Sequence, residues 1–184
     1  MTVVAGEDYS EQDLSGQVFE ELHFNGCDFT RANLSRATFE ACLFEDCNFT
    51  SPLISKTKLI DARFVRCKLL GLNFYHFDQF ALSFAFDECV LRLCVFSNLK
   101  LRKLKISGCQ IVECDFKESD LTEANFSKSV FRDTLFHQVN LEKADFRDAQ
   151  NYSLDPRANN LTKARFSQPD VLNLLAPFGI VVEG

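Results

Sequence analysis

The sequence has little of what enzymes and membrane proteins usually need. Its seven glycines are scattered, so there is no glycine-rich loop that could hold a phosphate. Its three histidines, His23, His76 and His137, lie far apart, and none has an evident nucleophile or carboxylate partner. No run of about twenty apolar residues is long enough to cross a bilayer, and residues 1–10 contain no basic segment followed by an apolar stretch. We therefore expect a cytoplasmic protein that is not an enzyme and carries no cofactor.

The sequence does have a large apolar residue at every fifth position. Thirteen consecutive fifth positions from Leu14 to Phe74 are apolar, thirteen more follow from Phe86 to Phe146, and Leu161 and Phe166 keep the second frame. A period of five fits neither the 3.6-residue turn of a helix nor the two-residue alternation of a strand. It predicts a solenoid, one elongated domain in which each unit buries its apolar side by stacking on its neighbours. Sixteen of the twenty phenylalanines occupy these central positions, so we expect them to form the core.

The residue two places before each central one is usually small, and every cysteine occupies such a place. Alanine and serine replace cysteine in other units, and no Cys-x-x-Cys pair exists. Because free cysteine behaves as a small hydrophobe, we interpret these residues as core positions, not as disulfides or metal ligands. Unpaired thiols also favour a reducing compartment. The eight residues are Cys27, Cys42, Cys47, Cys67, Cys89, Cys94, Cys109 and Cys114.

Units such as Ala32-Asn33-Leu34-Ser35-Arg36 and Ala144-Asp145-Phe146-Arg147-Asp148 resemble pentapeptide repeats, whose pattern is small, polar, Leu or Phe, polar, polar. The resemblance covers roughly residues 14–166. It implies an all-β fold, a right-handed β-helix of square cross-section, in which four pentapeptides make one coil. Because neighbouring strands lie about 4.8 Å apart, the rod should be roughly 35 Å long. We assign residues 1–166 to this β-helix and residues 167–184 to a C-terminal cap.

Two interruptions divide the repeat. The interval from Phe74 to Phe86 spans twelve residues instead of ten, which predicts a kink at residues 75–85 between two stacks of coils. Residues 150–160 are rich in turn-forming residues, so we expect a surface loop there.

Residues 167–184 predict a short helix and an apolar tail over the last coil. Ser167 resembles an N-cap, Pro169 and Asp170 suit the first turn, and Gly179 is a plausible helix stop. A lid is useful here because the open end of a stack exposes strand edges. The lid is also expected to form a two-fold dimer interface through the apolar residues Val171, Leu172, Leu174, Leu175, Phe178 and Ile180.

This tail, Leu174 to Gly184, is similar to the C-terminal end of the Qnr-type quinolone-resistance proteins and the related microcin-immunity protein. The resemblance implies a homodimer joined at its C-terminal ends, shaped and charged like B-DNA. It also implies binding to DNA gyrase, and to topoisomerase IV in some members, with relief of inhibition by drugs or peptide toxins. Many Qnr proteins carry projecting loops that help to protect the enzyme, whereas this chain has only the small interruption near residue 80. Binding to gyrase is therefore expected to carry over better than rescue of the enzyme.

The charges are distributed unevenly. Residues 1–50 hold ten acids and two bases, residues 51–105 hold four acids and ten bases, and residues 106–184 hold twelve acids and eight bases. Rows of carboxylates one coil apart approximate the charge density of duplex DNA. If two chains join at their C-termini, the expected acidic partner-binding surface consists of Glu113, Asp115, Glu118, Asp120, Glu123, Asp133, Glu142, Asp145 and Asp148.

The basic middle segment, residues 56–105, could instead contact nucleic acid. The sequence shows no exposed aromatic residues interleaved with these bases, and the chain as a whole has a net charge of -6. We therefore do not expect direct binding to nucleic acid.

Two hypotheses remain. The first is a DNA mimic that binds gyrase, with or without topoisomerase IV. The second is a structural or scaffolding solenoid with an unrelated protein partner, because a fold alone does not specify a function. The sequence leaves open the drug or toxin, the preferred topoisomerase, whether the effect is protection or inhibition, and the role of the basic segment.

Overall fold

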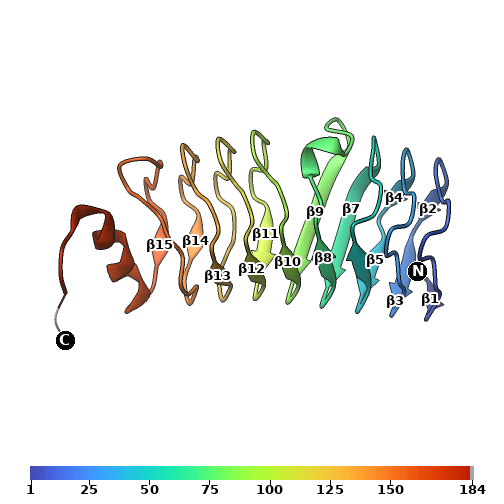
Figure 1. Ribbon diagram of the computed structural model, residues 1–184, viewed down its shortest axis with the longest axis horizontal. Coiled ribbons are helices and arrows are strands. Elements are labelled where there is room, and N and C mark those ends of the chain that lie inside the picture. The colour runs from blue at the N-terminus through green and yellow to red at the C-terminus, as the bar shows by residue number, and fades with distance from the viewer. Residues whose placement is uncertain (183–184) are drawn as a thin grey trace.

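The chain folds into a rod of stacked coils (Figure 1). The computed structural model describes residues 1–182, so Glu183 and Gly184 of the expected cap lie outside the described part. It is a β-solenoid of about 8 turns with one short helix at the C-terminal end, which confirms the expected right-handed β-helix. The N-terminal strand and the C-terminal helix lie at opposite ends of the rod.

The described strands are short and the two helical segments are of the 3-10 type. The strands are β1 Thr2–Ala5, β2 Val18–Glu20, β3 Leu22–Asn25, β4 Thr38–Glu40, β5 Leu43–Glu45, β6 Asn48–Thr50, β7 Lys58–Val65, β8 Lys68–Leu70, β9 Leu82–Asp87, β10 Val90–Arg92, β11 Lys105–Ser107, β12 Gln110–Val112, β13 Val130–Arg132, β14 Asp145–Phe146 and β15 Arg165–Phe166, and the helices are η1 Phe74–His76 and η2 Asp170–Phe178.

Parallel pairing between successive coils follows the sequence period. Thr2 of β1 pairs with Leu22 of β3, and Val90 of β10 pairs with Gln110 of β12, so one coil takes twenty residues. Across the interruption Lys68 of β8 pairs with Val90, so that coil takes twenty-two. Four pentapeptides therefore make one coil on both sides of the interruption.

Each pentapeptide bonds to the coils on both sides of it. The amide of Asp28 donates to Glu7 in the preceding coil at 3.0 Å, and that of Phe29 donates to Asn48 in the following coil at 2.8 Å. The chain then turns a corner at Arg31, whose φ of 54° is left-handed. A non-glycine residue in this region costs about 1–2 kcal/mol. Hydrogen bonds to the neighbouring coils hold the backbone in this conformation, which explains why residues other than glycine are tolerated at such corners.

The core is a set of aligned side-chain columns. In one of them Phe24, Phe44 and Phe64 stack with ring centroids 5.1 and 4.8 Å apart. Phe44 also meets Phe29 and Phe49 edge to face. Stacked and edge-to-face pairs both suit the aromatic quadrupole, so phenylalanine fills the column in register with the coils.

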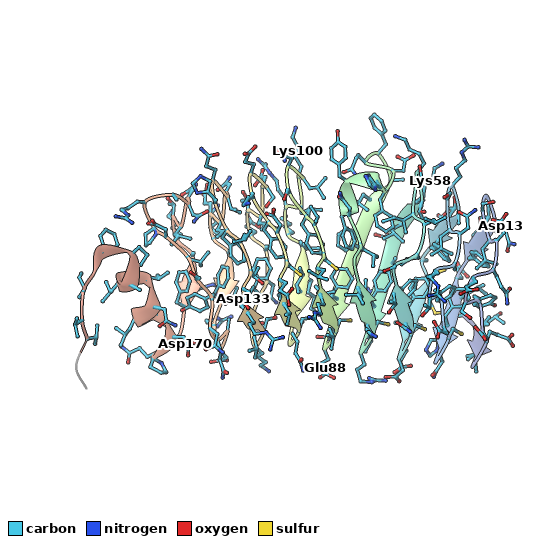
Figure 2. The ribbon with its side chains drawn as sticks, in the orientation of Figure 1. Asp13, Lys58, Glu88, Lys100, Asp133 and Asp170 are labelled. Atoms are coloured by element: carbon cyan, nitrogen blue, oxygen red, sulfur yellow. The ribbon has the colours of Figure 1, made fainter. Side chains whose placement is uncertain are left out.

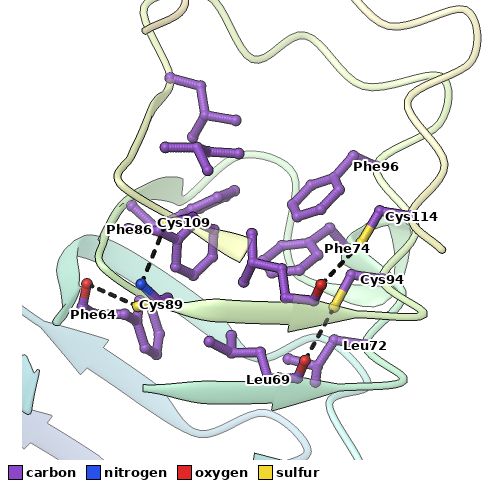
Figure 3. Close-up of a cluster of buried hydrophobic side chains, with 14 of the residues drawn as sticks. Phe64, Leu69, Leu72, Phe74, Phe86, Cys89, Cys94, Phe96, Cys109 and Cys114 are labelled. Atoms are coloured by element: carbon purple, nitrogen blue, oxygen red, sulfur yellow. Dashed lines mark hydrogen bonds between the residues drawn. The ribbon is translucent and has the colours of Figure 1, made fainter. Parts of the chain in front are cut away.

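All eight cysteines are free and buried, as expected. Cys94 packs beside Leu69 and Leu72 one coil away, and its thiol donates to the Leu69 carbonyl at 3.7 Å (Figure 3). The thiol of Cys42 donates to the Phe19 carbonyl at 3.4 Å, and burial raises the pKa of Cys42. Cys42 and Cys94 are therefore buried small residues whose thiols also satisfy carbonyl groups of the neighbouring coil.

A paired substitution tests this packing. Cys47 is 2% exposed and its thiol donates to the carbonyls of Phe24 and Glu45. Cys47→Leu should overpack the column and lower the free energy of unfolding by about 1–3 kcal/mol. Cys47→Ala, the matched variant, should have a smaller effect in urea denaturation. Equal tolerance of both variants would contradict the inward placement of the thiol.

The interruption lies between η1 and β9. Asp78 still donates to the Thr57 carbonyl at 2.8 Å, whereas Leu59 donates to Ala81 at 3.1 Å, and the β7–β9 register shifts between Leu59 and Ala62. Residues 74–84 form this interruption, which we call the knuckle, and it projects from the rod at the upper edge of Figure 1 next to β9.

Residues 150–160 differ from the expected surface loop. Tyr152 is 2% exposed and Leu154 is 1% exposed, so both belong to the core. The Tyr152 ring packs between Phe146 and Phe166, with centroids 5.5 Å from each, and burial raises its pKa to about 12. The segment also continues the coil, because Gln138 donates to the Ala158 carbonyl. The sequence pattern failed here because the tyrosine that fills the core lies one residue after the expected central position.

The C-terminal helix is present, but its start differs from the expectation. It begins at Asp170 and has no side-chain N-cap, because the Ser167 hydroxyl bonds Asp148 at 3.2 Å instead. It ends at Gly179, whose φ of 69° provides the expected left-handed stop. Leu174 packs against the core, so the helix forms a lid on the last coil.

Candidate partner-binding surfaces

The nine predicted acidic residues surround the rod and do not form one patch. Asp115 shares a column with Val95 and Leu135, Asp120 shares another with Lys100 and Asn140, and Asp145 shares a third with Asn125 and Arg165. Glu113, Glu118, Glu123, Asp133 and Asp148 lie at left-handed corners between the faces. A partner on one side of the rod could contact only some of these side chains.

Three of these acids also shape the repeat itself. The carboxylates of Asp115, Asp120 and Asp145 each accept the amide two residues later, at distances of 2.8 to 3.1 Å. This is the local turn that Asp and Asn side chains commonly form. An acid at this position therefore has a structural reason to be there, independent of any partner.

Six of the nine acids are also paired with bases. Their partners lie on the same coil or one coil away: Glu113 with Arg92, Asp115 with Lys117, Asp120 with Arg102, Glu123 with Lys103 and Lys143, Glu142 with Lys143, and Asp145 with Arg147 and Arg165. Within residues 1–182, only Glu118, Asp133 and Asp148 of the nine lack a base within 4.0 Å. The C-terminal half therefore carries less uncompensated negative charge than its sequence indicates.

Asp145 is the most enclosed of the nine. It is 7% exposed, and the Arg147 guanidinium donates to both carboxylate oxygens, which lowers the pKa of Asp145. Asp155 and Arg157 form the same two-residue pair in a more exposed position. The two pairs differ mainly in burial.

Because its pKa is lower when folded, Asp145 contributes stability above the unfolded pKa near 4, and this contribution is lost as the pH falls through the folded pKa. We expect Asp145→Asn to lower the free energy of unfolding at pH 7 by about 1 kcal/mol, since its arginine partners remain in contact with solvent. The difference from the unmodified protein should shrink below about pH 4. Urea denaturation at pH 7 and pH 3 measures both values. Asp155→Asn is the control and should have a smaller effect, and a larger one would contradict the role assigned to burial.

The N-terminal coils carry acids with fewer partners. Arg31 is the first Lys or Arg in the chain. Glu20 of β2 pairs in register with Glu40 of β4, which places two carboxylates one coil apart as the sequence predicts. Neither has a base within 4.0 Å in the described part of the chain. The negative charge of these coils is therefore less compensated by bases than that of the rest of the rod.

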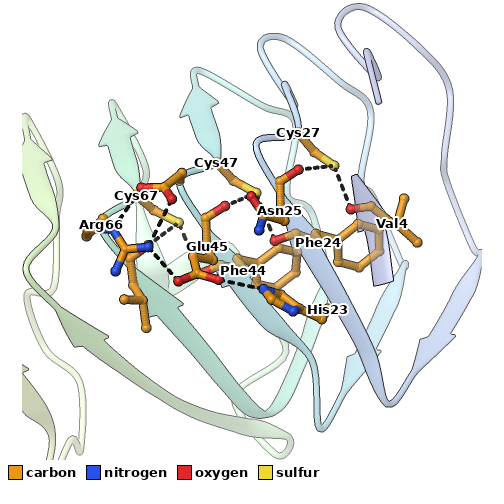
Figure 4. A network of polar contacts seen from close by, with 12 residues as sticks. Val4, His23, Phe24, Asn25, Cys27, Phe44, Glu45, Cys47, Arg66 and Cys67 are labelled. Carbon is orange, nitrogen blue, oxygen red and sulfur yellow. Dashed lines mark hydrogen bonds and ion pairs between the residues drawn. The ribbon is translucent and has the colours of Figure 1, made fainter. Parts of the chain in front are cut away.

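Further along the same half, one acid is neutralised on an exposed face. Glu45 accepts from the His23 ring at 2.8 Å and from Arg66 at 2.5 Å (Figure 4), and the Arg66 hydrogen bond lowers the pKa of Glu45. Of the three histidines, all of which lie within the described residues 1–182, His23 is the only one within 4.0 Å of a carboxylate. This contact links adjacent coils.

The predicted dimer residues divide into two groups. Leu174 packs on the core, and Val171 and Leu175 are half-buried. Leu172, Phe178 and Ile180 are 42%, 49% and 52% exposed. An arginine of the last coil, Arg157, lies over the Phe178 ring at 5.1 Å. Apart from this arginine contact, the lid leaves these apolar side chains exposed.

The basic segment carries exposed aromatic rings that sequence reasoning did not place. Phe80 is fully exposed and Tyr75 is 62% exposed, and both lie on the knuckle between β8 and β9. Their frame relative to the repeat is lost at the interruption, so the sequence alone could not distinguish them from the buried Phe77 and Phe84. The expectation that no aromatic residue lies exposed among these bases was wrong.

Residues 1–182 contain no group of three or more His, Cys, Asp and Glu side chains arranged to hold a metal ion. Over the same residues, neither helical segment has the length and apolar character needed to span a membrane.

Comparison with known proteins identifies the same five-residue unit that forms the coils. Residues 13–46 and 114–149 match the family model for pentapeptide repeats, in 8 copies. These two ranges therefore consist of pentapeptide repeats, and the rod has the pentapeptide-repeat fold. Two trypsin-treated variants of QnrB1, described as a plasmid-mediated fluoroquinolone resistance protein, are similar in structure over 99% of this chain and 98% of theirs, with 18% identity and TM-scores of 0.67 and 0.68.

A second solved pentapeptide-repeat protein is less similar. HetL, involved in heterocyst differentiation regulation in the cyanobacterium Nostoc sp. strain PCC 7120, aligns over 87% of this chain and 85% of its own, with 16% identity and a TM-score of 0.42. None of the curated proteins matches the sequence. At 18% identity, the likeness to QnrB1 establishes the pentapeptide-repeat fold.

Proposed function

We propose that this pentapeptide-repeat protein binds a type II DNA topoisomerase, DNA gyrase or topoisomerase IV, as a mimic of duplex DNA and without catalysis of its own. The observation that carries the proposal is the end-to-end likeness to QnrB1, which includes 99% of this chain and therefore both the coils and the C-terminal lid. By binding the topoisomerase, the protein would modulate its inhibition by quinolones or toxins. Because that partner is cytoplasmic, the proposal also places this protein in the cytoplasm.

The surface charge supports mimicry most strongly in the N-terminal coils. Successive coils are about 4.8 Å apart, which approaches the 3.4 Å spacing of phosphates along one DNA strand. Glu20 and Glu40 occupy successive coils and are unpaired within the described residues. A protein that recognises DNA mainly through phosphates could accept such a row of carboxylates.

The C-terminal lid supports a homodimer. Leu172 within the helix, Phe178 at its end and Ile180 just beyond it are all exposed. Exposed apolar groups at the end of a rod suit a two-fold contact with the same surface of a second copy. A dimer of this kind would double the rod, with the free N-terminal acids at its two outer ends and the largely paired C-terminal acids at its centre.

The test is gyrase supercoiling of relaxed plasmid, titrated with the purified protein with and without ciprofloxacin. Recovery of supercoiling in the presence of drug indicates a protective mimic, and inhibition without drug indicates a mimic that competes with DNA. Absence of an effect in both arms, together with absence of gyrase binding in a pull-down with purified subunits, would refute the proposal.

Charge variants test whether the carboxylates contribute. Glu20→Gln combined with Glu40→Gln removes two unpaired charges and should weaken gyrase binding several-fold. Glu123→Gln is the control, because Lys103 and Lys143 lie 3.9 Å from that carboxylate and compensate its charge. Equal effects of both sets would show that the pattern of free acids does not matter.

One observation favours the alternative, a scaffolding solenoid with an unrelated protein partner. Six of the nine acids expected to contact a topoisomerase form ion pairs within the rod, as a solvated polar surface would. Failure of the gyrase experiment would favour this alternative.

A further inference from the structure

The knuckle formed by residues 74–84 presents two aromatic rings to solvent. Phe80 is fully exposed and Tyr75 is 62% exposed, although every other aromatic residue of the coils from Phe24 to Phe146 is buried. Neither ring therefore serves the packing of the rod. Exposed aromatic side chains on a defined structure are common features of binding surfaces.

Hydrogen bonds fix the shape of the knuckle. The Gln79 side chain donates to the carbonyls of Phe74 and Phe77 at 2.9 and 3.0 Å. The carboxylate of Asp78 accepts the Phe80 amide at 3.0 Å. Phe77, 4% exposed, stacks on Phe74 at 5.0 Å and anchors the segment in the core. The rings are thus held out by an ordered turn, which lowers the entropy cost of binding through them.

Lysines flank the knuckle along the rod. Figure 2 shows Lys58 and Lys100 at the same edge of the rod, with the knuckle between them. Both are exposed, as is Lys56, and none of the three has a carboxylate within 4.0 Å in residues 1–182. Asp78 lies one coil after Lys58, because its amide donates to the Thr57 carbonyl. The next coil takes twenty-two residues, as the pairing of Asn73 with Val95 shows, so Lys100 lies about two coils, roughly 10 Å, beyond Lys58. We call Lys56, Lys58, Lys100, Tyr75 and Phe80 the aromatic-basic ridge.

We propose that the aromatic-basic ridge binds single-stranded nucleic acid. The lysines neutralise backbone phosphates, and the two rings stack on bases. A ring that stands clear of the surface offers both of its faces to flat bases. A peptide anchor, in contrast, gains most of its binding energy by entering a pocket. This activity does not depend on the proposed binding to a topoisomerase.

Carboxylates near the ridge weaken its positive charge. Asp78 and Asp61 stay charged while they accept the Phe80 amide at 3.0 Å and the Ser83 hydroxyl at 2.8 Å. Glu40 pairs in register with Ile60 on the strand of Lys58, and Asp120 pairs in register with Lys100, so both carboxylates also oppose the attraction of phosphates. Binding should therefore be weak, with a Kd of about 10–100 μM at low salt.

The test is fluorescence anisotropy of the full chain with a labelled oligothymidylate in 50 mM salt. We expect saturable binding that Phe80→Ala weakens about 10-fold, and that Lys58→Ala combined with Lys100→Ala also weakens. Three neutralised phosphates predict a slope of log K against log salt of about -2. Leu93→Ala and Lys128→Ala are matched exposed controls and should bind as the unmodified chain does. Because Phe80 is fully exposed, its replacement should leave urea denaturation unchanged.

Competitors separate stacking from charge. Heparin and polyglutamate carry negative charge without bases, so both should compete more weakly than unlabelled oligothymidylate of equal charge. Absence of saturable binding, or an unchanged Kd for Phe80→Ala, would overturn the proposal. Equal competition by polyglutamate would also overturn it and would indicate an acidic protein segment as the ligand.

Discussion

Phe44→Ala is expected to lower the free energy of unfolding by about 3–5 kcal/mol, a large part of the 5–15 kcal/mol typical of a domain. The Phe44 side chain is fully buried and stacks on Phe24 and Phe64 in the coils before and after it. It also meets Phe29 and Phe49 edge to face. Alanine would leave a cavity that in-register coils cannot close, because their backbone hydrogen bonds fix the spacing. Urea denaturation followed by circular dichroism measures the loss.

Phe19→Ala is the matched control. Phe19 lies in the first coil, is only partly buried, and stacks on Phe39 from one side. Its replacement should cost roughly half as much, since an end position has one neighbouring coil instead of two. A larger loss for Phe19 than for Phe44 would mean that the N-terminal coil, and not the middle of the stack, controls unfolding. A split transition for Phe44→Ala would show that the cavity uncouples the coils.

The coils could be predicted because the same two inward positions recur in every unit. Phe44 and Cys47 face inward for the reason that Phe24 and Cys27 do, and each additional coil repeats the constraint. The sequence period therefore gives the strand register directly, including the change from twenty to twenty-two residues at the interruption.

Prediction failed where the chain departs from the five-residue period, because burial there no longer follows the position in the repeat. Tyr152 fills the core from a position next to the expected one, and Phe80 projects although Phe77 and Phe84 on either side are buried. These outcomes depend on local turns, such as the Gln79 contacts with the Phe74 and Phe77 carbonyls. A five-residue pattern has no information about such turns.

The sequence predicts where the acidic side chains lie, but it does not predict which of them are paired with bases. Glu113 and Glu123 are where the repeat places them, at corners facing solvent. Their pairing with Arg92 and with Lys103 and Lys143 depends on which side chains fall one coil away. The twenty-residue register, once known, would have revealed these pairs.

A monomeric variant is expected from a single change in the lid. Leu172 is 42% exposed and belongs to the proposed two-fold interface. Leu172→Asp would place two unpaired carboxylates in that interface, one from each copy, and should raise the dimer Kd by at least about 100-fold, or roughly 3 kcal/mol. Light scattering should give twice 21.0 kDa for the unmodified chain and 21.0 kDa for the variant. Leu174 is less suitable because it packs against the core, so its replacement could detach the lid.

Leu93→Asp is the control, because Leu93 is a similarly exposed leucine, at 48%, in the middle of the rod. It should leave the mass and the urea midpoint unchanged. An unmodified chain that scatters as a monomer at high micromolar concentration would refute the interface. The supercoiling assay with Leu172→Asp then decides what the dimer does. If the monomer affects gyrase as strongly as the dimer does, one rod is sufficient for recognition, and the doubled length does not contribute to the mimicry of DNA.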